Sequence, residues 1–132
     1  MSEKTREAKR EDLVRLRFLE AVAARLPDDD AVLAALGDLY TRVGFYQEGL
    51  AADFRLVELR PGEALVWYNL GCSLALVNRR GEAIEALKRA VSLGYDDLAW
   101  MARDEDLRSL RDEGAFRALI GAAEKTANSG EG

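Results

Sequence analysis

The chain matches itself when it is shifted along its own length by 34 residues. The same residue occurs in both copies at the pairs Pro27 and Pro61, Leu36 and Leu70, Gly37 and Gly71, Glu48 and Glu82, and Leu59 and Leu93. A fixed period of this size is typical of stacked helical hairpins, because one hairpin alone cannot bury its apolar face. The sequence therefore predicts a repeat protein that presents a surface to another chain.

Apolar residues recur at helical spacing along most of the chain, without the alternation typical of strands. The predicted helices cover residues 10–26, 31–43, 46–59, 64–77 and 81–93. Pro27 and the aspartates after it end the first helix, and Gly44 ends the second. The predicted fold class is all-α, an α-solenoid of antiparallel helix pairs.

At 132 residues the chain is long enough for one domain. The predicted helical-repeat domain, residues 1–125, has four parts: a partial repeat over 10–29, full repeats over 30–63 and 64–97, and a degenerate capping unit over 98–125. The pattern decays in the last part, because shifting Gly71 by one period gives Glu105, which is unsuited to close helix packing. The polar residues 126–132 predict a disordered tail.

The overall charge makes nucleic acid a poor candidate partner. The formal net charge is −5 and the pI is about 4.9, so little counterion release is available. Residues 1–26 differ, with a net charge of +2. Their alternating charges indicate a solvated helix face, and a site for an anionic partner is the alternative.

The composition argues against an enzyme, a cofactor and a metal site. Histidine is absent, which removes the most common general base and metal ligand. Cys72 lies on an apolar helix and is predicted to be a buried, unreactive thiol. The acidic runs 28–30 and 104–106 lack the glycine turn and distal glutamate of a calcium loop, and capping of helix N-termini explains both.

The expected compartment is the cytoplasm. One cysteine cannot form an internal disulfide. Residues 1–17 are too charged for a signal peptide, and the longest apolar stretch, 65–77, is too short to cross a bilayer. We expect no membrane association.

Small and bulky apolar residues in the two full copies are placed so that paired helices can approach closely. These residues are Leu33, Leu36, Gly37, Tyr40, Gly44, Tyr46 and Pro61 in the first copy, and Trp67, Leu70, Gly71, Leu74, Ala83, Ala90 and Tyr95 in the second. The two copies resemble tetratricopeptide repeats, except that Gly49 stands where that family has alanine and Asp53 where it has a bulky apolar residue. Residues 104–119 resemble a capping unit of some bacterial proteins of this kind. The resemblance implies a right-handed superhelix.

The resemblance also implies a binding groove, because the first helix of each pair lines the concave side in that family. The candidate groove residues are Asp38, Arg42, Leu65, Tyr68, Asn69, Cys72, Leu76 and Arg103. They favour an interaction module, with a scaffold or adaptor role, that binds a peptide or helix of another protein. The family's clamp for chaperone tails is disfavoured, since Asp38 would repel a carboxylate. Packing of Tyr68 and Leu65 against neighbouring repeats is the alternative.

A second hypothesis is a structural protein that forms a homodimer through its N-terminal helix. An incomplete repeat would leave an exposed apolar stripe on Leu13, Leu16 and Phe18. The partner's identity and the oligomeric state are not determined by the sequence.

Overall fold

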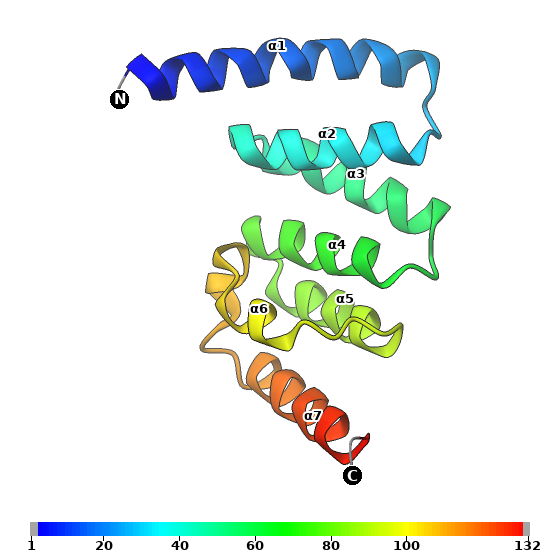
Figure 1. Cartoon of the computed structure of the whole chain (residues 1–132), viewed down its shortest axis with the longest axis vertical. Helices are drawn as coiled ribbons and strands as arrows, with labels where there is room; N and C mark the ends of the chain where they lie inside the picture. The colour runs from blue at the N-terminus through cyan, green and yellow to red at the C-terminus, as the bar shows by residue number, and fades with distance from the viewer. Residues whose placement is uncertain (1–2, 131–132) are drawn as a thin grey trace. The chain divides into compact units, whose positions relative to one another are not determined.

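The structure, a computed structural model, describes residues 3–130 and is helical throughout, with no strand in that range. Its elements are α1 (Glu3–Arg25), α2 (Asp30–Val43), α3 (Tyr46–Leu59), α4 (Ala64–Leu76), α5 (Arg80–Ser92), α6 (Leu98–Arg103), the 3₁₀-helix η1 (Glu105–Leu110) and α7 (Gly114–Gly130) (Figure 1). The all-α prediction is therefore confirmed. Over the same residues, no helix has both the length and the apolar content needed to cross a lipid bilayer.

The chain divides into two compact units, Met1–Leu59 and Arg60–Gly132. The first unit contains α1, α2 and α3, and the second contains α4 to α7 together with η1. The division falls close to the boundary predicted between the repeats 30–63 and 64–97.

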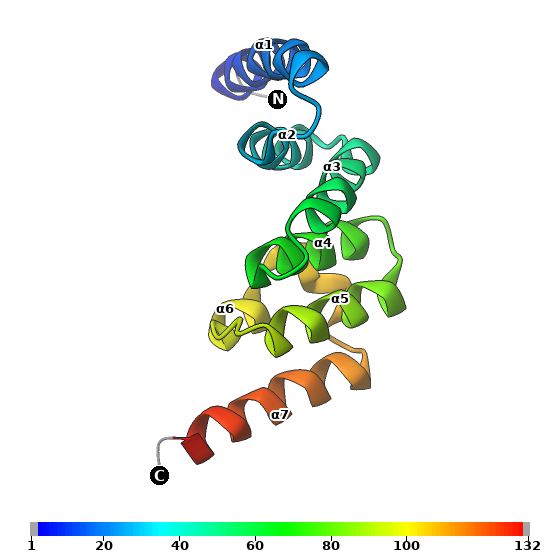
Figure 2. The ribbon, with the colours of Figure 1, turned by 90° about the vertical axis from the view of Figure 1, so that its right-hand side faces the viewer.

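In the first unit α2 packs against both α1 and α3. The core lies between α1 and α2, which run side by side in both views (Figures 1 and 2). It is formed by Leu16, Leu36, Leu39 and Val43, with partly buried Leu13, Leu19, Ala23, Val32 and Tyr40 around them. The predicted exposed stripe is thus wrong for Leu16, which is buried, and for Leu13, which packs against this core. Phe18 is exposed as predicted.

In the second unit α4 and α5 form an antiparallel hairpin, and the C-terminal elements cover it. The 3₁₀-helix η1 packs against α4, while α7 packs against α5 and α6. The largest fully buried side chains come from all of these later elements as well as from α5: Leu87, Met101, Leu107, Leu110 and Phe116.

Glycines lie at the helix crossings of both hairpins, as the sequence predicts. A Cβ atom built on Gly71 in α4 would lie 2.7 Å from Leu87 Cδ2 and 2.8 Å from Leu87 Cγ in α5. A Cβ on Gly37 in α2 would lie 3.0 Å from Asp53 Oδ1 in α3, and one on Gly49 would lie 3.0 Å from Thr41 Oγ1. The departures at Gly49 and Asp53 therefore both lie where α2 and α3 approach closely, Gly49 next to Thr41 and Asp53 next to Gly37.

The helix starts follow the 34-residue period through both units. The first helices of the pairs begin at Asp30, Ala64 and Leu98, and the second helices begin at Tyr46, Arg80 and Gly114. The N-cap positions Asp29, Glu63 and Asp97 keep the same interval. The terminal unit therefore retains the period in its backbone, although its side-chain pattern decays.

The turn that follows the first helix of a pair also repeats, after α2 and after α4. Gly44 has φ 90° and Asn78, one period later, has φ 63°, so both end their helix in the left-handed region. Asparagine is one of the few residues other than glycine that tolerate this conformation.

The C-terminal helix is longer than predicted. Residues 126–130 belong to α7 instead of a disordered tail, and residues 131–132 lie outside the described range. At the other end α1 begins at Glu3, so it extends well beyond the predicted start at residue 10.

We expect Gly71→Ala to lower the free energy of unfolding by about 1–3 kcal/mol, because the new methyl group would overlap the buried side chain of Leu87. Urea denaturation followed by circular dichroism measures the change. The matched control is Gly81→Ala in α5, where a Cβ meets no atom within 4 Å. This control should leave stability unchanged or raise it by up to about 1 kcal/mol. Equal stabilities of the two variants would contradict the crossing at Gly71.

Candidate functional site

The eight predicted groove residues differ in their exposure to solvent. Asp38 and Arg42 are exposed on α2 of the first unit, and Arg42 pairs with Asp12 of α1 at 3.4 Å. In the second unit Leu65 and Arg103 are exposed, whereas Asn69 and Leu76 are half-buried. Tyr68 and Cys72 are buried, so they do not offer their side chains to a partner.

Tyr68 is buried because residues far along the chain cover it. Its ring stacks on that of Tyr95, with the centroids 4.3 Å apart and the planes 5° from parallel. Its hydroxyl donates a hydrogen bond to Asp104 Oδ2 at 2.7 Å. The alternative in which Tyr68 packs within the fold is therefore the observed one.

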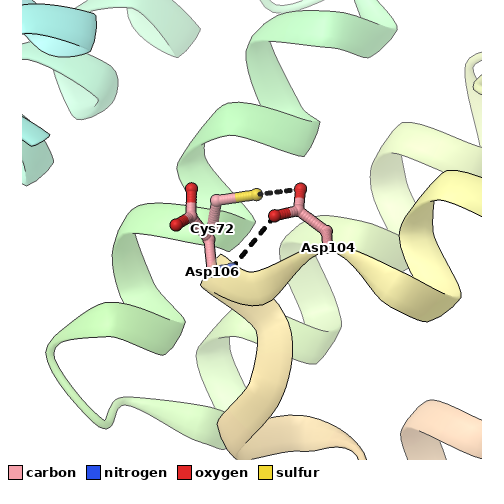
Figure 3. Close-up of side chains that lie close together, drawn as sticks. All are labelled: Cys72, Asp104 and Asp106. Atoms are coloured by element: carbon pink, nitrogen blue, oxygen red, sulfur yellow. Dashed lines mark hydrogen bonds between the residues drawn. The ribbon is translucent and has the colours of Figure 1, made fainter. Parts of the chain in front are cut away.

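Asp104 joins three elements of the second unit. It follows the last residue of α6 and caps η1, because its Oδ1 accepts the backbone N–H of Asp106 at 3.0 Å. Its Oδ2 accepts from the Tyr68 hydroxyl. It also accepts from the Cys72 thiol of α4 at 3.7 Å, and Figure 3 shows this contact together with the one to Asp106. Both carboxylate oxygens thus accept hydrogen bonds although the side chain is buried.

The electrostatics of this cluster keep the donors protonated. Burial raises the pKa of the Tyr68 hydroxyl far above its ordinary value, and the hydrogen bond to Asp104 adds to the effect. Burial also raises the pKa of the Cys72 thiol, and the negative charges of Asp104 and Asp106 raise it further. A protonated thiol is neither a nucleophile nor a good metal ligand. The arrangement can fix α4 against η1, and it does not activate Cys72.

In the part of the chain that the structure describes, Cys72, Asp104 and Asp106 lie in a geometry that approaches that of a metal site. One potential ligand atom from each lies within 4.8 Å of the other two. Burial, followed by the charge of Asp104, raises the pKa of Asp106 as well. The hydrogen bonds that Asp104 accepts explain why the Cys72 thiol lies next to it, whereas Asp106 is joined to it through its backbone N–H.

The solvent-facing part of the candidate site includes a residue that the sequence analysis missed. Trp100 of α6 is 42% exposed, and the guanidinium of Arg103 lies 5.7 Å from its ring centroid. The sequence does contain a signal for this residue: Trp100 and Arg103 are three residues apart, which places both on one helix face. On α4, Leu65 is 61% exposed. We call Leu65, Asn69, Trp100 and Arg103 the outer residues of α4 and α6.

An open cavity of about 480 Å³ lies on a different part of the second unit. None of the predicted groove residues lines it. The end of α5, the loop after it, the start of α6 and α7 form its walls, which are mostly apolar: Val91, Ser92, Gly94, Tyr95, Asp96, Leu98, Leu119, Ala122, Ala123 and Thr126. Asp96 is the only charged residue among them.

A comparison with known proteins gives one informative similarity. No family model matches the chain. Protein FlbA of Caulobacter vibrioides is 42% identical over 80 residues, which cover 58% of this chain and 13% of FlbA. The similar region is thus more than half of this chain but a small part of a much longer protein.

We expect Tyr68→Phe to lower the free energy of unfolding by about 1–3 kcal/mol, because it leaves the buried Asp104 Oδ2 with the weak thiol donor alone. The matched control is Tyr40→Phe, which removes a hydrogen bond of the same length, 2.7 Å, to the exposed Glu20. Water can replace that donor, so the control should change stability by about 0.5 kcal/mol or less. Chemical denaturation of both variants measures the difference. A loss no larger than that of Tyr40→Phe would show that Asp104 is not held by Tyr68.

The Cys72 thiol should react at least about a hundredfold more slowly with Ellman's reagent in the native protein than in urea. In the unfolded chain the rate should rise between about pH 7 and 9 as the thiolate forms. The native rate should stay low over this interval, because the folded pKa lies well above the ordinary value. A native rate that follows the unfolded pH profile would contradict the burial and charge assigned to Cys72.

Proposed function

We propose that the chain is a tetratricopeptide-like helical-repeat module, an α-solenoid of antiparallel helix pairs in the form of a right-handed superhelix. In this proposal it binds a peptide or helical segment of another protein through the first helices of its pairs. Its role is that of a scaffold or adaptor, without catalytic activity.

The observation that supports this most strongly is the regular interval between helix starts. Three successive pairs begin at Asp30, Ala64 and Leu98, and their second helices begin at the same interval. Repeats of this length are stable through contacts between neighbouring pairs, and they present extended surfaces to partner chains.

The distribution of exposed apolar side chains supports the choice of the first helices. Within the described part of the second unit, the exposed large apolar side chains are Leu65 of α4 and Trp100 of α6, and both helices are first members of a pair. The second helices α5 and α7 leave none exposed over their described side chains. In this unit the exposed apolar residues favour a binding role for the first helices, whereas in the first unit Tyr46, at the start of the second helix α3, is 41% exposed.

The outer residues of α4 and α6 also indicate what the partner segment contains. Leu65 and Trp100 offer contact to an apolar side chain, and the Arg103 guanidinium offers two parallel donors to a carboxylate. The amide of Asn69 can both donate to and accept from a peptide backbone. The proposed ligand is a segment with an apolar anchor and a nearby acidic group.

Self-association through α1 has less support. Two of the three residues that suggested it, Leu13 and Leu16, pack against α2. The similarity to FlbA is consistent with a module inside a longer protein, since the chain spans 13% of that protein's length.

The test is the selection of binding peptides from a displayed random library on the full chain, with affinities measured by calorimetry. We expect Trp100→Ala and Arg103→Ala each to weaken binding about tenfold or more, because both remove contacts to the anchor and its acidic neighbour. The matched control is Arg89→Ala on α5, where the guanidinium lies 6.0 Å from the ring of Trp67. Equal losses in Arg89→Ala and Arg103→Ala, or selection of no peptide at all, would contradict the proposal.

A further inference from the structure

The outer face of α1 has features that the proposed binding by α4 and α6 does not use. The inner face is occupied by α2: Leu16 is buried, Arg42 donates to Asp12 at 3.4 Å, and Tyr40 donates to Glu20 at 2.7 Å. These contacts fix which side of α1 faces the core and which side faces solvent.

Two large apolar side chains project from the outer face. Val14 is 65% exposed and Phe18 is 67% exposed, more than the other exposed large apolar residues of the described chain. Ala21 and Arg25, both exposed, continue the line of Val14 and Phe18 with steps of three and four residues. This is the spacing of the seam by which one helix packs along another.

Cations lie on both edges of this line. Arg10 and Arg17 are seven residues apart and fall on one edge, while Arg15 falls on the opposite edge. All three side chains are exposed, and Arg15 also pairs with Asp12 at 3.6 Å while it remains 59% exposed. Between Val14 and Arg25 the one carboxylate is Glu20, which accepts from Tyr40 on the inner side. Glu7 and Glu11, both exposed, are the acidic residues at the N-terminal end of the line.

We propose that this face of α1, which we call the Phe18 face (Val14, Phe18 and Ala21 with Arg10, Arg15 and Arg17), binds an amphipathic helix of a partner protein. The partner's apolar seam packs on Val14 and Phe18, and Asp or Glu side chains on both sides of that seam pair with the arginines. The site is separate from the outer residues of α4 and α6.

A second copy of the chain fits this face poorly. In an antiparallel pair that places Phe18 against Val14, the two-fold axis brings Arg15 and Arg17 near their own counterparts. In a parallel pair, Arg10 of one copy faces Arg15 of the other across the seam. Both arrangements align like charges, whereas an acidic partner helix converts the same positions into ion pairs.

A lipid surface fits less well than a helix. Binding of a helix to a membrane scales with the apolar area that it buries. Among the described residues the free apolar area consists mainly of Val14, Phe18 and Ala21, because Leu13, Leu16, Leu19 and Ala23 pack in the core with α2. An apolar area of this size is enough for contact with the narrow apolar seam of one partner helix.

The test uses two synthetic helical peptides with the same leucine seam, one flanked by glutamates and the other by lysines, titrated into the full chain and measured by fluorescence anisotropy. The glutamate peptide should bind at least about tenfold more tightly, and the difference should shrink as salt is added. Phe18→Ser should weaken binding of the glutamate peptide about tenfold. The matched control, Phe45→Ser, alters another exposed phenylalanine of the first unit, 42% exposed, and should leave binding unchanged.

Two control measurements and two tests of the other possible occupants complete the experiment. Thermal unfolding of Phe18→Ser should match that of the unchanged chain, since the side chain is exposed. Arg103→Ala should leave binding of the glutamate peptide intact, which separates this site from that of the proposed function. Equal affinity for both peptides would overturn the proposal. So would dimerisation lost in Phe18→Ser by sedimentation equilibrium, or co-sedimentation with phosphatidylserine vesicles lost in the same variant.

Discussion

The close approach of two helices within each pair is the constraint on which the rest of the structure depends. Gly71 has no Cβ, and the space next to it is filled by Leu87, which is completely buried. In the first unit the approach of α2 and α3 is achieved by small residues on both sides, Gly37 and Gly49, with Asp53 against Gly37. Protein interiors are packed densely, so one added methyl group at such a crossing would displace both helices of the pair. The surfaces that α1, α4 and α6 present to solvent exist because the opposite faces of these helices are committed to such packing.

Asp104 has a comparable role at the C-terminal end, but it acts through polar contacts. A buried carboxylate is unfavourable unless its oxygens accept hydrogen bonds. Here the donors come from two residues of α4, Tyr68 and Cys72, and from the backbone of η1 at Asp106. The carboxylate therefore specifies where η1 lies on α4. It also explains why a tyrosine and a cysteine are located inside the second unit.

Much of the fold was predictable from the sequence, and the candidate site was predictable only in part. The helices follow from the local spacing of apolar residues. The glycines at the helix crossings and the turn at Gly44 follow from the lack of space for a Cβ atom and from a positive φ, which few residues adopt. The burial of Tyr68 depends on Asp104, 36 residues later, after an α6 of only six residues. Periodicity shows which face of a helix is apolar, but it does not show what covers that face. The same limit applies to α1, where Leu16 and Phe18 both looked exposed until the orientation of the helix on α2 was known.

The repeated ends of the helix pairs have a consequence for how such a chain changes in length. Each 34-residue segment has a capping position before its first helix (Asp29, Glu63 or Asp97), and the first two have a left-handed residue after it (Gly44 or Asn78). A segment copied in frame would contain its own N-cap residue and its own turn residue, so no new connecting loop would be needed. Duplication or deletion of one such segment would therefore change the length of the chain in whole steps, while point mutation at the two left-handed positions is restricted to the few residues that the backbone tolerates.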